Sequence, residues 1–170
     1  FTRGLIIPLQ QARIHLRRGT MKIWIRNRQK HIPLNLRKIR RAAQRILTEL
    51  GFLEAELSLL FVNDLQIQAL NRKHLRRDKP TNVLAFPMRD GEFSTLHPHL
   101  LGDLVISVET ARRQSNRFGL DEMEMVVFLM VHGVLHLIGY EHEGTKKGAR
   151  EMALKQKDLF QNGLETGILE

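Results

Sequence analysis

The sequence predicts an α+β fold in which a small mixed β-sheet packs with about five helices in one domain. The chain has 170 residues, enough for a single domain that buries about two-thirds of the surface of its unfolded chain. Hydrophobic residues make up 42% and charged residues 26% of it, as is ordinary for a globular protein. Segments with the period of strands and of helices follow one another in the order β-α-β-α-β-β-α-α-α.

Four segments have the composition of strands. They are rich in β-branched and apolar residues and are bounded by turn-forming residues. The first alternates Ile23 and Ile25 with polar neighbours, which is the two-residue period of a strand. A turn-rich loop at residues 90–100 separates the third segment from the fourth. The predicted strands are residues 21–29, 55–63, 81–88 and 102–109.

Five segments repeat apolar residues at helical spacing. The first has a strongly basic outer face, and Gly51 ends it. The fourth has Asp121, Glu122 and Glu124 in its first turn, where carboxylates favour the positive end of the helix dipole. Its later part is apolar on all sides, so we expect it to be the central buried helix. The predicted helices are residues 34–50, 64–75, 110–119, 120–139 and about 145–161.

The net charge of +9 is unevenly distributed along the chain. Residues 1–50 contain thirteen Lys or Arg and one acidic residue, Glu49, which gives them a net charge of +12. The remaining 120 residues have a net charge of −3. A basic block of this kind suggests an anionic partner, with nucleic acid ahead of a membrane surface, although a solvated basic face is also consistent with it.

The sequence indicates one domain at residues 21–162, preceded by an extension at 1–20 and followed by a tail at 163–170. No apolar run approaches the ~20 residues that cross a bilayer, so no membrane association is expected. The apolar run near the start is shorter than the ~7 residues of a signal peptide. The chain has no cysteine, which excludes disulfides and thiolate metal sites and fits a cytoplasmic location.

Residues 132–142, "HGVLHLIGYEH", carry three histidines within an apolar segment. His132 and His136 are four residues apart, so on a helix they lie one turn apart on the same face. Gly139 can end that helix and let the chain turn back, which brings His142 towards the other two. Burying three unpaired imidazoles would cost several kcal/mol, so metal binding explains them better than a role in the core. Three protein ligands with one open position are typical of a catalytic zinc.

The spacing of the histidines matches the H-x-x-x-H-x-x-G-x-x-H skeleton of the metzincin proteases, with one difference. In those enzymes the residue after the first histidine is a glutamate that acts as the general base. Here that residue is Gly133, which cannot transfer a proton. The sequence therefore favours another metal-dependent hydrolase over a metallopeptidase.

Three blocks of the sequence resemble the YbeY family of bacterial single-strand-specific endoribonucleases. The block at 132–142 is similar to the family pattern H-G-x-L-H-L-x-G-Y-D-H, with Glu141 in place of Asp. The block "LNRKHLRRDKPTNVLAFPM" at 70–88 and the block "LGDLVISVETARRQ" at 101–114 resemble two further family patterns. The blocks keep the family order, and the likeness extends from Met21 to about residue 160.

This resemblance implies a zincin-like fold with a buried, histidine-bearing active-site helix. It implies one Zn²⁺ bound by His132, His136 and His142. It also implies endoribonuclease activity on single-stranded RNA in small-subunit rRNA maturation and ribosome quality control. The expected partners are rRNA and the ribosome or its proteins, and no DNA partner is expected.

The chain departs from the family pattern next to its basic residues. Leu75 stands where many members have an arginine thought to contribute to activity, and Arg76 and Arg77 follow it directly. Either arginine is a candidate for neutralising charge on a phosphate. Glu141 is a candidate to hydrogen-bond a ligand imidazole, to act as a weak general base, or to be only an exposed loop acid. Two other functions stay open, a zinc metallopeptidase and a ribosome-assembly protein whose metal stabilises the fold.

Overall fold

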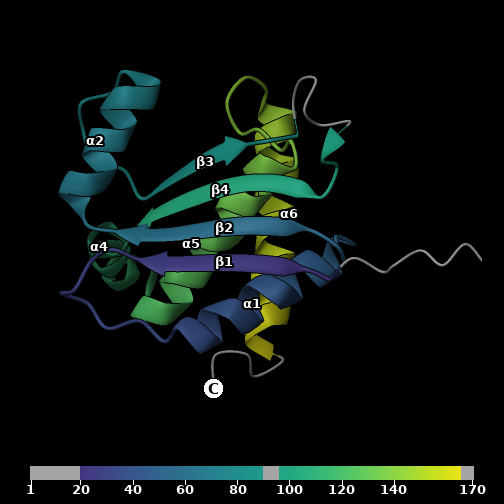
Figure 1. Cartoon of the computed structure of the whole chain (residues 1–170), viewed down its shortest axis with the longest axis horizontal. Coiled ribbons are helices and arrows are strands. Elements are labelled where there is room, and N and C mark those ends of the chain that lie inside the picture. Colours follow the sequence, from purple (N-terminus) through teal and green to yellow (C-terminus); the bar gives the residue numbers. More distant parts are fainter. Residues whose placement is uncertain (1–19, 90–95, 166–170) are drawn as a thin grey trace, which may run out of the picture.

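The computed structural model describes residues 20–89 and 96–165, and the side chains of these residues up to 162. Within them, four strands form one mixed sheet with the order β1-β2-β4-β3 (Figure 1). Strands β1, β2 and β4 are parallel, and β3 is antiparallel to β4. The strands are β1 Lys22–Asn27, β2 Glu56–Val62, β3 Val83–Pro87 and β4 Leu100–Ser107.

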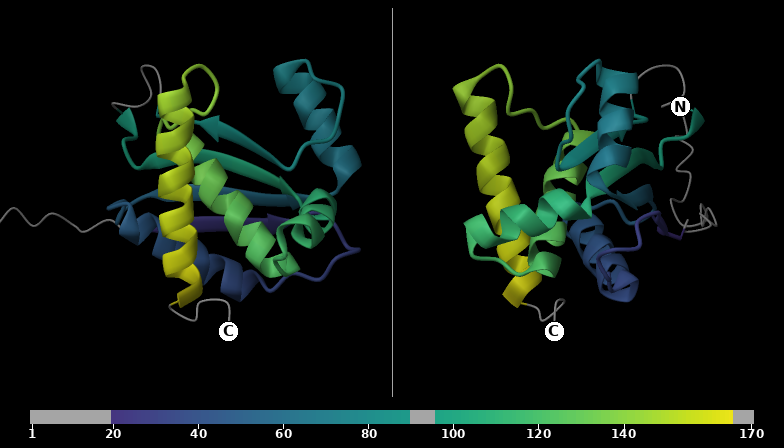
Figure 2. Two further views of the ribbon diagram at one scale, coloured as in Figure 1. Left: turned by 180° about the vertical axis from the view of Figure 1, so that it is seen from behind. Right: turned by 90° about the vertical axis from the view of Figure 1, so that its left-hand side faces the viewer.

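In the described ranges, five long helices pack with this sheet, as the sequence predicts. Seen from behind, α5 and α6 cross in front of the strands (Figure 2, left), so these helices and α1 lie on one face of the sheet. The element order matches the predicted order in the described part of the chain. The helices are α1 Leu36–Glu49, α2 Asp64–Leu75, α4 Val108–Phe118, α5 Glu122–Leu137 and α6 Lys146–Glu165.

The two faces of the sheet have separate hydrophobic clusters. Leu104 and Ile106 of β4 point towards α1, α5 and α6 and belong to the larger cluster. Val105, between them, belongs to a smaller cluster with Ile67 of α2. Because successive residues of a strand point to opposite faces, α2 packs on the face away from α5. The sheet is thus covered by three helices on one side and partly by α2 on the other.

Several element boundaries differ from the predicted ones by two residues or more, among them the start of β4 and the end of α6, and α4 begins at Val108, inside the predicted strand. Strand β4 begins at Leu100 because Leu100 pairs with Glu56 of β2, so cross-strand pairing extends the strand into the predicted loop. Helix α6 continues to Glu165 beyond the predicted end near residue 161. Most of the predicted extension at 1–20, part of the predicted loop at 90–100 and most of the predicted tail at 163–170 lie outside the described residues, namely at 1–19, 90–95 and 166–170.

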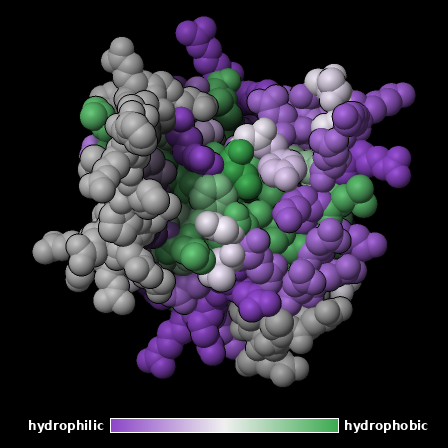
Figure 3. Space-filling model, turned by 90° about the vertical axis from the view of Figure 1, so that its right-hand side faces the viewer, coloured by the Kyte–Doolittle hydropathy of each residue, from purple (hydrophilic) through white to green (hydrophobic). Residues whose placement is uncertain are grey.

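Helix α5 is the central buried helix, as its composition predicts. Ten of its sixteen residues are buried, which no amphipathic surface helix would show. A capping box starts it: the Asp121 carboxylate accepts from the backbone N–H of Glu124 at 2.7 Å, and Glu124 accepts from that of Asp121 at 2.8 Å. On one face of the molecule, hydrophobic side chains are visible at the surface with hydrophilic ones beside them (Figure 3).

Helix α2 is held in place by a partly buried acid–hydroxyl cluster at its first residue. Asp64 accepts hydrogen bonds from the hydroxyls of Ser107 at 2.6 Å and Thr110 at 2.7 Å. Arg113 pairs with its second oxygen at 2.7 Å. These contacts tie the start of α2 to the junction of β4 and α4. None of the helices in the described ranges is long and apolar enough to span a membrane.

Candidate functional site

Three histidines converge where α5 ends. His132 and His136 lie one turn apart on α5 and are half-buried. Helix α5 ends at Leu137, and Gly139 has a positive φ of 100° that favours glycine. The chain reverses there and returns His142, which is exposed, to the other two. The structure thus brings together the three residues that the sequence spacing selects.

The distances between the three imidazoles fit one bound ion. One nitrogen of each ring lies within 4.8 Å of the others, and the ring centroids are 4.7 to 5.3 Å apart. The Nε2 atoms of His132 and His136 are 3.1 Å apart. Two nitrogens at 2.0–2.1 Å from a tetrahedral zinc would be about 3.3 Å apart. Three neutral imidazoles with a free position are a donor set that suits Zn²⁺.

Gln156 of α6 orients the first of these histidines. Its side chain is buried, with 7% exposure, and its Nε2 donates to the backbone carbonyl of Phe128 at 3.3 Å. Its carbonyl oxygen therefore faces His132, 3.0 Å from Nδ1. An acceptor at Nδ1 holds the proton there and leaves Nε2 with its lone pair towards the other histidines.

Sequence reasoning missed Gln156, although a signal was present. Met152, Leu159 and Phe160 form the buried face of α6, and Gln156 is a polar residue at the same helical spacing. A buried polar side chain on an apolar helix face requires a hydrogen-bond partner. Here that partner is a histidine 24 residues away in the chain.

Burial lowers the pKa of both helical histidines from their ordinary value of 6.5. For His132, desolvation is the main cause, and the hydrogen bond with Gln156 opposes it. For His136, desolvation is followed by repulsion from His132 and His142, while Glu141 and the backbone of Tyr140 favour the charged form. The neutral imidazole, which is the form that binds a metal, is therefore favoured at neutral pH.

Gly133 is the point at which α5 touches the sheet. A Cβ atom there would lie 2.7 Å from Cδ2 of Leu104 and 3.2 Å from Cγ2 of Val83. A residue with a side chain would have to push α5 away from β4 and β3. The position that holds the general base in metzincins therefore packs against the sheet in this protein.

The histidines lie at one side of a cleft of about 680 Å³ between α2, β3 and the turn after α5. Arg77 and Glu141, two of the predicted residues, line this cleft. Arg76 does not line it; it ends α2 in the left-handed conformation, with φ 56°. Lys79 is a second cation in the cleft that the sequence reasoning missed.

Asn71 fixes the backbone of the segment that carries these cations. It is 2% exposed, and its side-chain amide donates to the backbone carbonyl of Lys79 at 2.8 Å. Gln68, also on α2, donates to Asp78 in the same segment at 3.1 Å. The segment after α2 is therefore attached to that helix at two points, which keeps Arg77 and Lys79 near the cleft.

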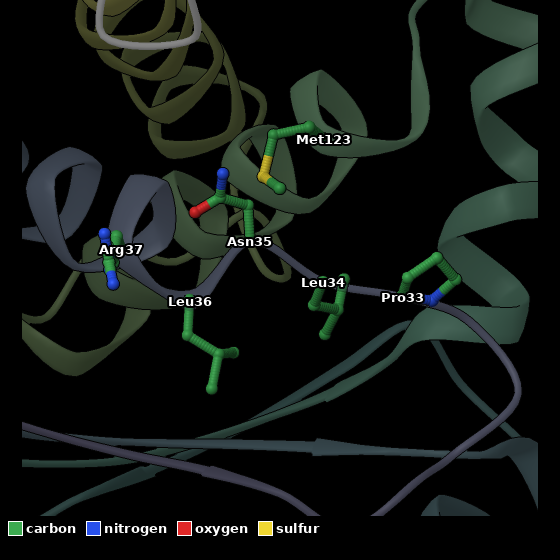
Figure 4. A pocket seen from close by; sticks show the side chains of 6 residues that line it. All are labelled: Pro33, Leu34, Asn35, Leu36, Arg37 and Met123. Carbon is green, nitrogen blue, oxygen red and sulfur yellow. The ribbon is translucent and has the colours of Figure 1, made fainter.

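A second cavity, of about 730 Å³, lies at the start of α1 (Figure 4). Its lining is mainly apolar, with Arg37 as the one charged residue and Asn35 already used to cap α1. It contains no group able to bind a metal or transfer a proton near neutral pH. The chemistry of the described residues therefore points to the histidine cleft. The lining residues are Pro33, Leu34, Asn35, Leu36, Arg37 and Met123.

Replacing Gln156 by leucine should weaken zinc binding by about 10- to 100-fold, because His132 loses the acceptor that fixes its tautomer and ring orientation. Competition with a chromophoric chelator would measure the dissociation constant. Gln156→Glu, which keeps an acceptor, is the matched control and should retain tight binding. Equal affinities of the leucine variant and the wild type would contradict this role.

The metal-free protein should lose stability as the pH falls below about 6.5. Histidines of the unfolded chain protonate near their ordinary pKa of 6.5. In the folded state the pKa values of His132 and His136 are lower. Below 6.5 the unfolded state thus binds more protons, which favours unfolding. Urea unfolding with a chelator present, at several pH values, checks this. His136→Ala should flatten the dependence, and a rise in stability on acidification would contradict it.

Gly133→Glu, which restores the metzincin motif, should destabilise the fold by about 3 kcal/mol or more, because a carboxylate would be forced against Leu104 and Val83. It should not generate peptidase activity. Thermal or urea unfolding and a casein assay would measure the two effects. The control is Leu154→Lys on α6, which introduces a charged side chain where the wild-type residue is 54% exposed. Near wild-type stability of the glutamate variant would be the contrary result.

Comparison with known proteins places this site in a family. The family model described as Endoribonuclease YbeY matches residues 24–163. A protein named endoribonuclease YbeY from Syntrophotalea carbinolica is 48% identical over 81% of this chain and 93% of its own length. One of the same name from Geobacter metallireducens is 42% identical over 82% of this chain and 94% of its own.

A solved structure has a similar fold. The solution structure of TM1509 from Thermotoga maritima aligns with a TM-score of 0.56 and 25% identity, over 82% of this chain and 87% of that one. The relatives named above are endoribonucleases, which are hydrolases, and the histidine cleft is built from residues inside the matched range. The chain belongs to the endoribonuclease YbeY family.

Proposed function

We propose that this protein is a zinc-dependent, single-strand-specific endoribonuclease that acts in small-subunit rRNA maturation and ribosome quality control. The observation that carries the proposal is the convergence of three imidazole nitrogens within 4.8 Å beside a cleft lined by two cations, Arg77 and Lys79, and by two carboxylates, Glu141 and Glu143. Metal ligands next to cations suit an anionic phosphodiester better than a neutral peptide bond. The family membership supports RNA as the substrate.

His132, His136 and His142 would hold the ion, and Gln156 would keep the first of them in its ligating tautomer. When bound, Zn²⁺ supplies a Lewis acid that polarises a phosphoryl oxygen and lowers the pKa of a coordinated water. The histidine-bearing α5 beneath a small mixed sheet is also the basis on which we assign residues 21–162 to the zincin-like folds.

Arg77 would neutralise charge on the scissile phosphate, a role for a cation that is already held in place. The structure favours it over Arg76 because only Arg77 lines the cleft. Lys79 is placed to assist. Glu141 also lines the cleft and acts electrostatically on His136, so it would tune the ligand histidines.

The basic face of α1 would contribute phosphate contacts that carry no sequence information. Part of this face is already engaged, because Arg40 donates to the backbone carbonyl of Ile23 and Arg45 pairs with Glu49. Arg37 and Arg41 remain exposed for such contacts. The proposal sets this activity in the cytoplasm, on rRNA in contact with the ribosome.

A metallopeptidase is disfavoured because the position of its general base is occupied by Gly133, which packs on the sheet. The zinc-loaded protein should cleave unstructured RNA and leave casein intact. Chelation or His132→Ala should abolish the RNA cleavage, because the ion loses a ligand. Cleavage that survives both would show a contaminating nuclease and overturn the proposal.

Arg77→Gln should lower kcat/KM for RNA cleavage on the order of a hundredfold, because one preorganised cation is lost from the cleft. Arg76→Gln is the matched control, since it removes the same charge one residue away, outside the cleft. It should change kcat/KM by less than a few-fold. Similar losses in the two variants would contradict the assignment of Arg77.

A further inference from the structure

Trp24 lies exposed on the sheet face away from α5. Its side chain is 65% exposed, whereas its neighbour Ile23 is 6% exposed and belongs to the main core. Residues two apart on a strand point to the same face, so Lys22 and Arg26 flank Trp24 on this face. Trp24 is also the only tryptophan in the chain.

The surroundings of Trp24 form a shallow hollow of about 390 Å³. In the sheet register Trp24 is beside Ser58 and Arg26 is beside Leu60. The short side chain of Ser58 leaves one side of the indole without a bulky cross-strand neighbour. The hollow is therefore open, with an aromatic ring, a cation and a leucine at its edges. Its lining residues are Trp24, Ile25, Arg26, Ser58, Leu59 and Leu60.

The two cations beside Trp24 are available to a ligand. Arg26 is exposed and has no ion pair with another residue in the described part of the chain. Lys22 pairs with Glu56 at 2.8 Å, but its side chain is 54% exposed. An ion pair of this kind contributes little and can be exchanged for a phosphate. The rise of a strand places Lys22 and Arg26 each about 7 Å along β1 from Trp24.

We propose that Lys22, Trp24 and Arg26, which we call the β1 platform, bind an unpaired segment of RNA outside the cleft. A base would stack on the indole, and the flanking phosphates would contact the two cations. Stacking on an exposed aromatic ring together with backbone cations is how proteins bind single strands without reading sequence. This proposal rests on the proposed function, which makes single-stranded RNA the substrate.

The platform lies at a distance from the histidine cleft. The cleft includes residues of β3, and the order β1-β2-β4-β3 places β1 three strand spacings, about 14 Å, from that strand. Trp24 pairs with Ser58, Ser58 pairs with Asp103, and Asp103 pairs with Phe86, so Asp103 lies between Trp24 and the strand next to the cleft. Its carboxylate would repel the phosphates of an RNA that crossed the sheet along this line. The RNA would therefore follow β1, and only an RNA longer than the cleft could occupy both surfaces.

Fluorescence tests the stacking directly, because all tryptophan emission of this protein comes from Trp24. The zinc-loaded wild type would be mixed rapidly with an oligouridylate of about sixteen nucleotides, the upper size bound by one single-strand-binding domain. The emission, read before cleavage, should be quenched in proportion to RNA bound. Binding of the RNA would be measured independently by the anisotropy of a labelled RNA. If the RNA binds and the Trp24 emission stays unchanged, the proposal is overturned.

Trp24→Ala should lower the affinity for the sixteen-nucleotide RNA roughly tenfold. Arg26→Gln should reduce the slope of log affinity against log salt by about one. Cleavage of an RNA of about four nucleotides, at the lower end of such site sizes, should be unchanged in both variants. The control is Phe118→Ala on α4, since Phe118 is a comparably exposed aromatic at 60%. Wild-type affinity of the tryptophan variant would overturn the proposal.

Two other occupants of the platform would give different results. If a second copy of the chain covers Trp24, the emission changes with protein concentration without RNA. If residues 1–19 cover it, deleting them shifts the emission of the free protein. Either result, with no quenching by RNA, overturns the proposal. Failure of the proposed function is distinguishable, because an inactive protein would still report binding through quenching.

Discussion

The contact between α5 and the sheet at Gly133 is the constraint on which the site depends. Because residue 133 has no side chain, the helix lies against Leu104 and Val83 with no room for a methyl group. This contact fixes the rotation of α5 about its axis. With Gly133 turned to the sheet, His132 and His136 face α6 and the cleft. The same glycine therefore sets the helix packing and the direction in which the two histidines point. Glycine at this position also means that the residue used as the general base in metzincins is missing. One residue therefore determines both how α5 packs on the sheet and which catalytic group the site lacks.

The histidine site is assembled from segments that are far apart in the chain. Helix α5 contributes two imidazoles and the following turn a third, while Gln156 reaches them from α6. On the other side, α2 holds the segment with Arg77 and Lys79 through Asn71. The Asp64 cluster in turn attaches α2 to β4 and α4. Helix α2 is thus attached at its start to β4 and α4 and near its end to the segment that carries the cations of the cleft.

The distribution of charge differs from the simplest reading of the sequence. The basic block suggests a continuous cationic helix, but Arg40 and Arg45 of α1 are used within the fold. Exposed cations lie on several separate surfaces, among them the cleft, the remaining part of α1 and the exposed face of β1. This arrangement suits a long, flexible anion better than a compact one, because each surface can hold a different stretch of backbone.

The sequence by itself determined the order of elements, the buried nature of α5 and the identity of the three histidines. These features depend on local periodicity and on spacings within one helix and one turn, which are written directly in the chain. Only the tertiary structure decided that Arg77, and not Arg76, lines the cleft, that Gln156 contacts His132, and that Gly133 touches the sheet. It also decided that Trp24 is exposed on the open face. Each of these depends on how distant segments meet, because a side chain's partner across the fold is set by packing and register, which no local pattern encodes.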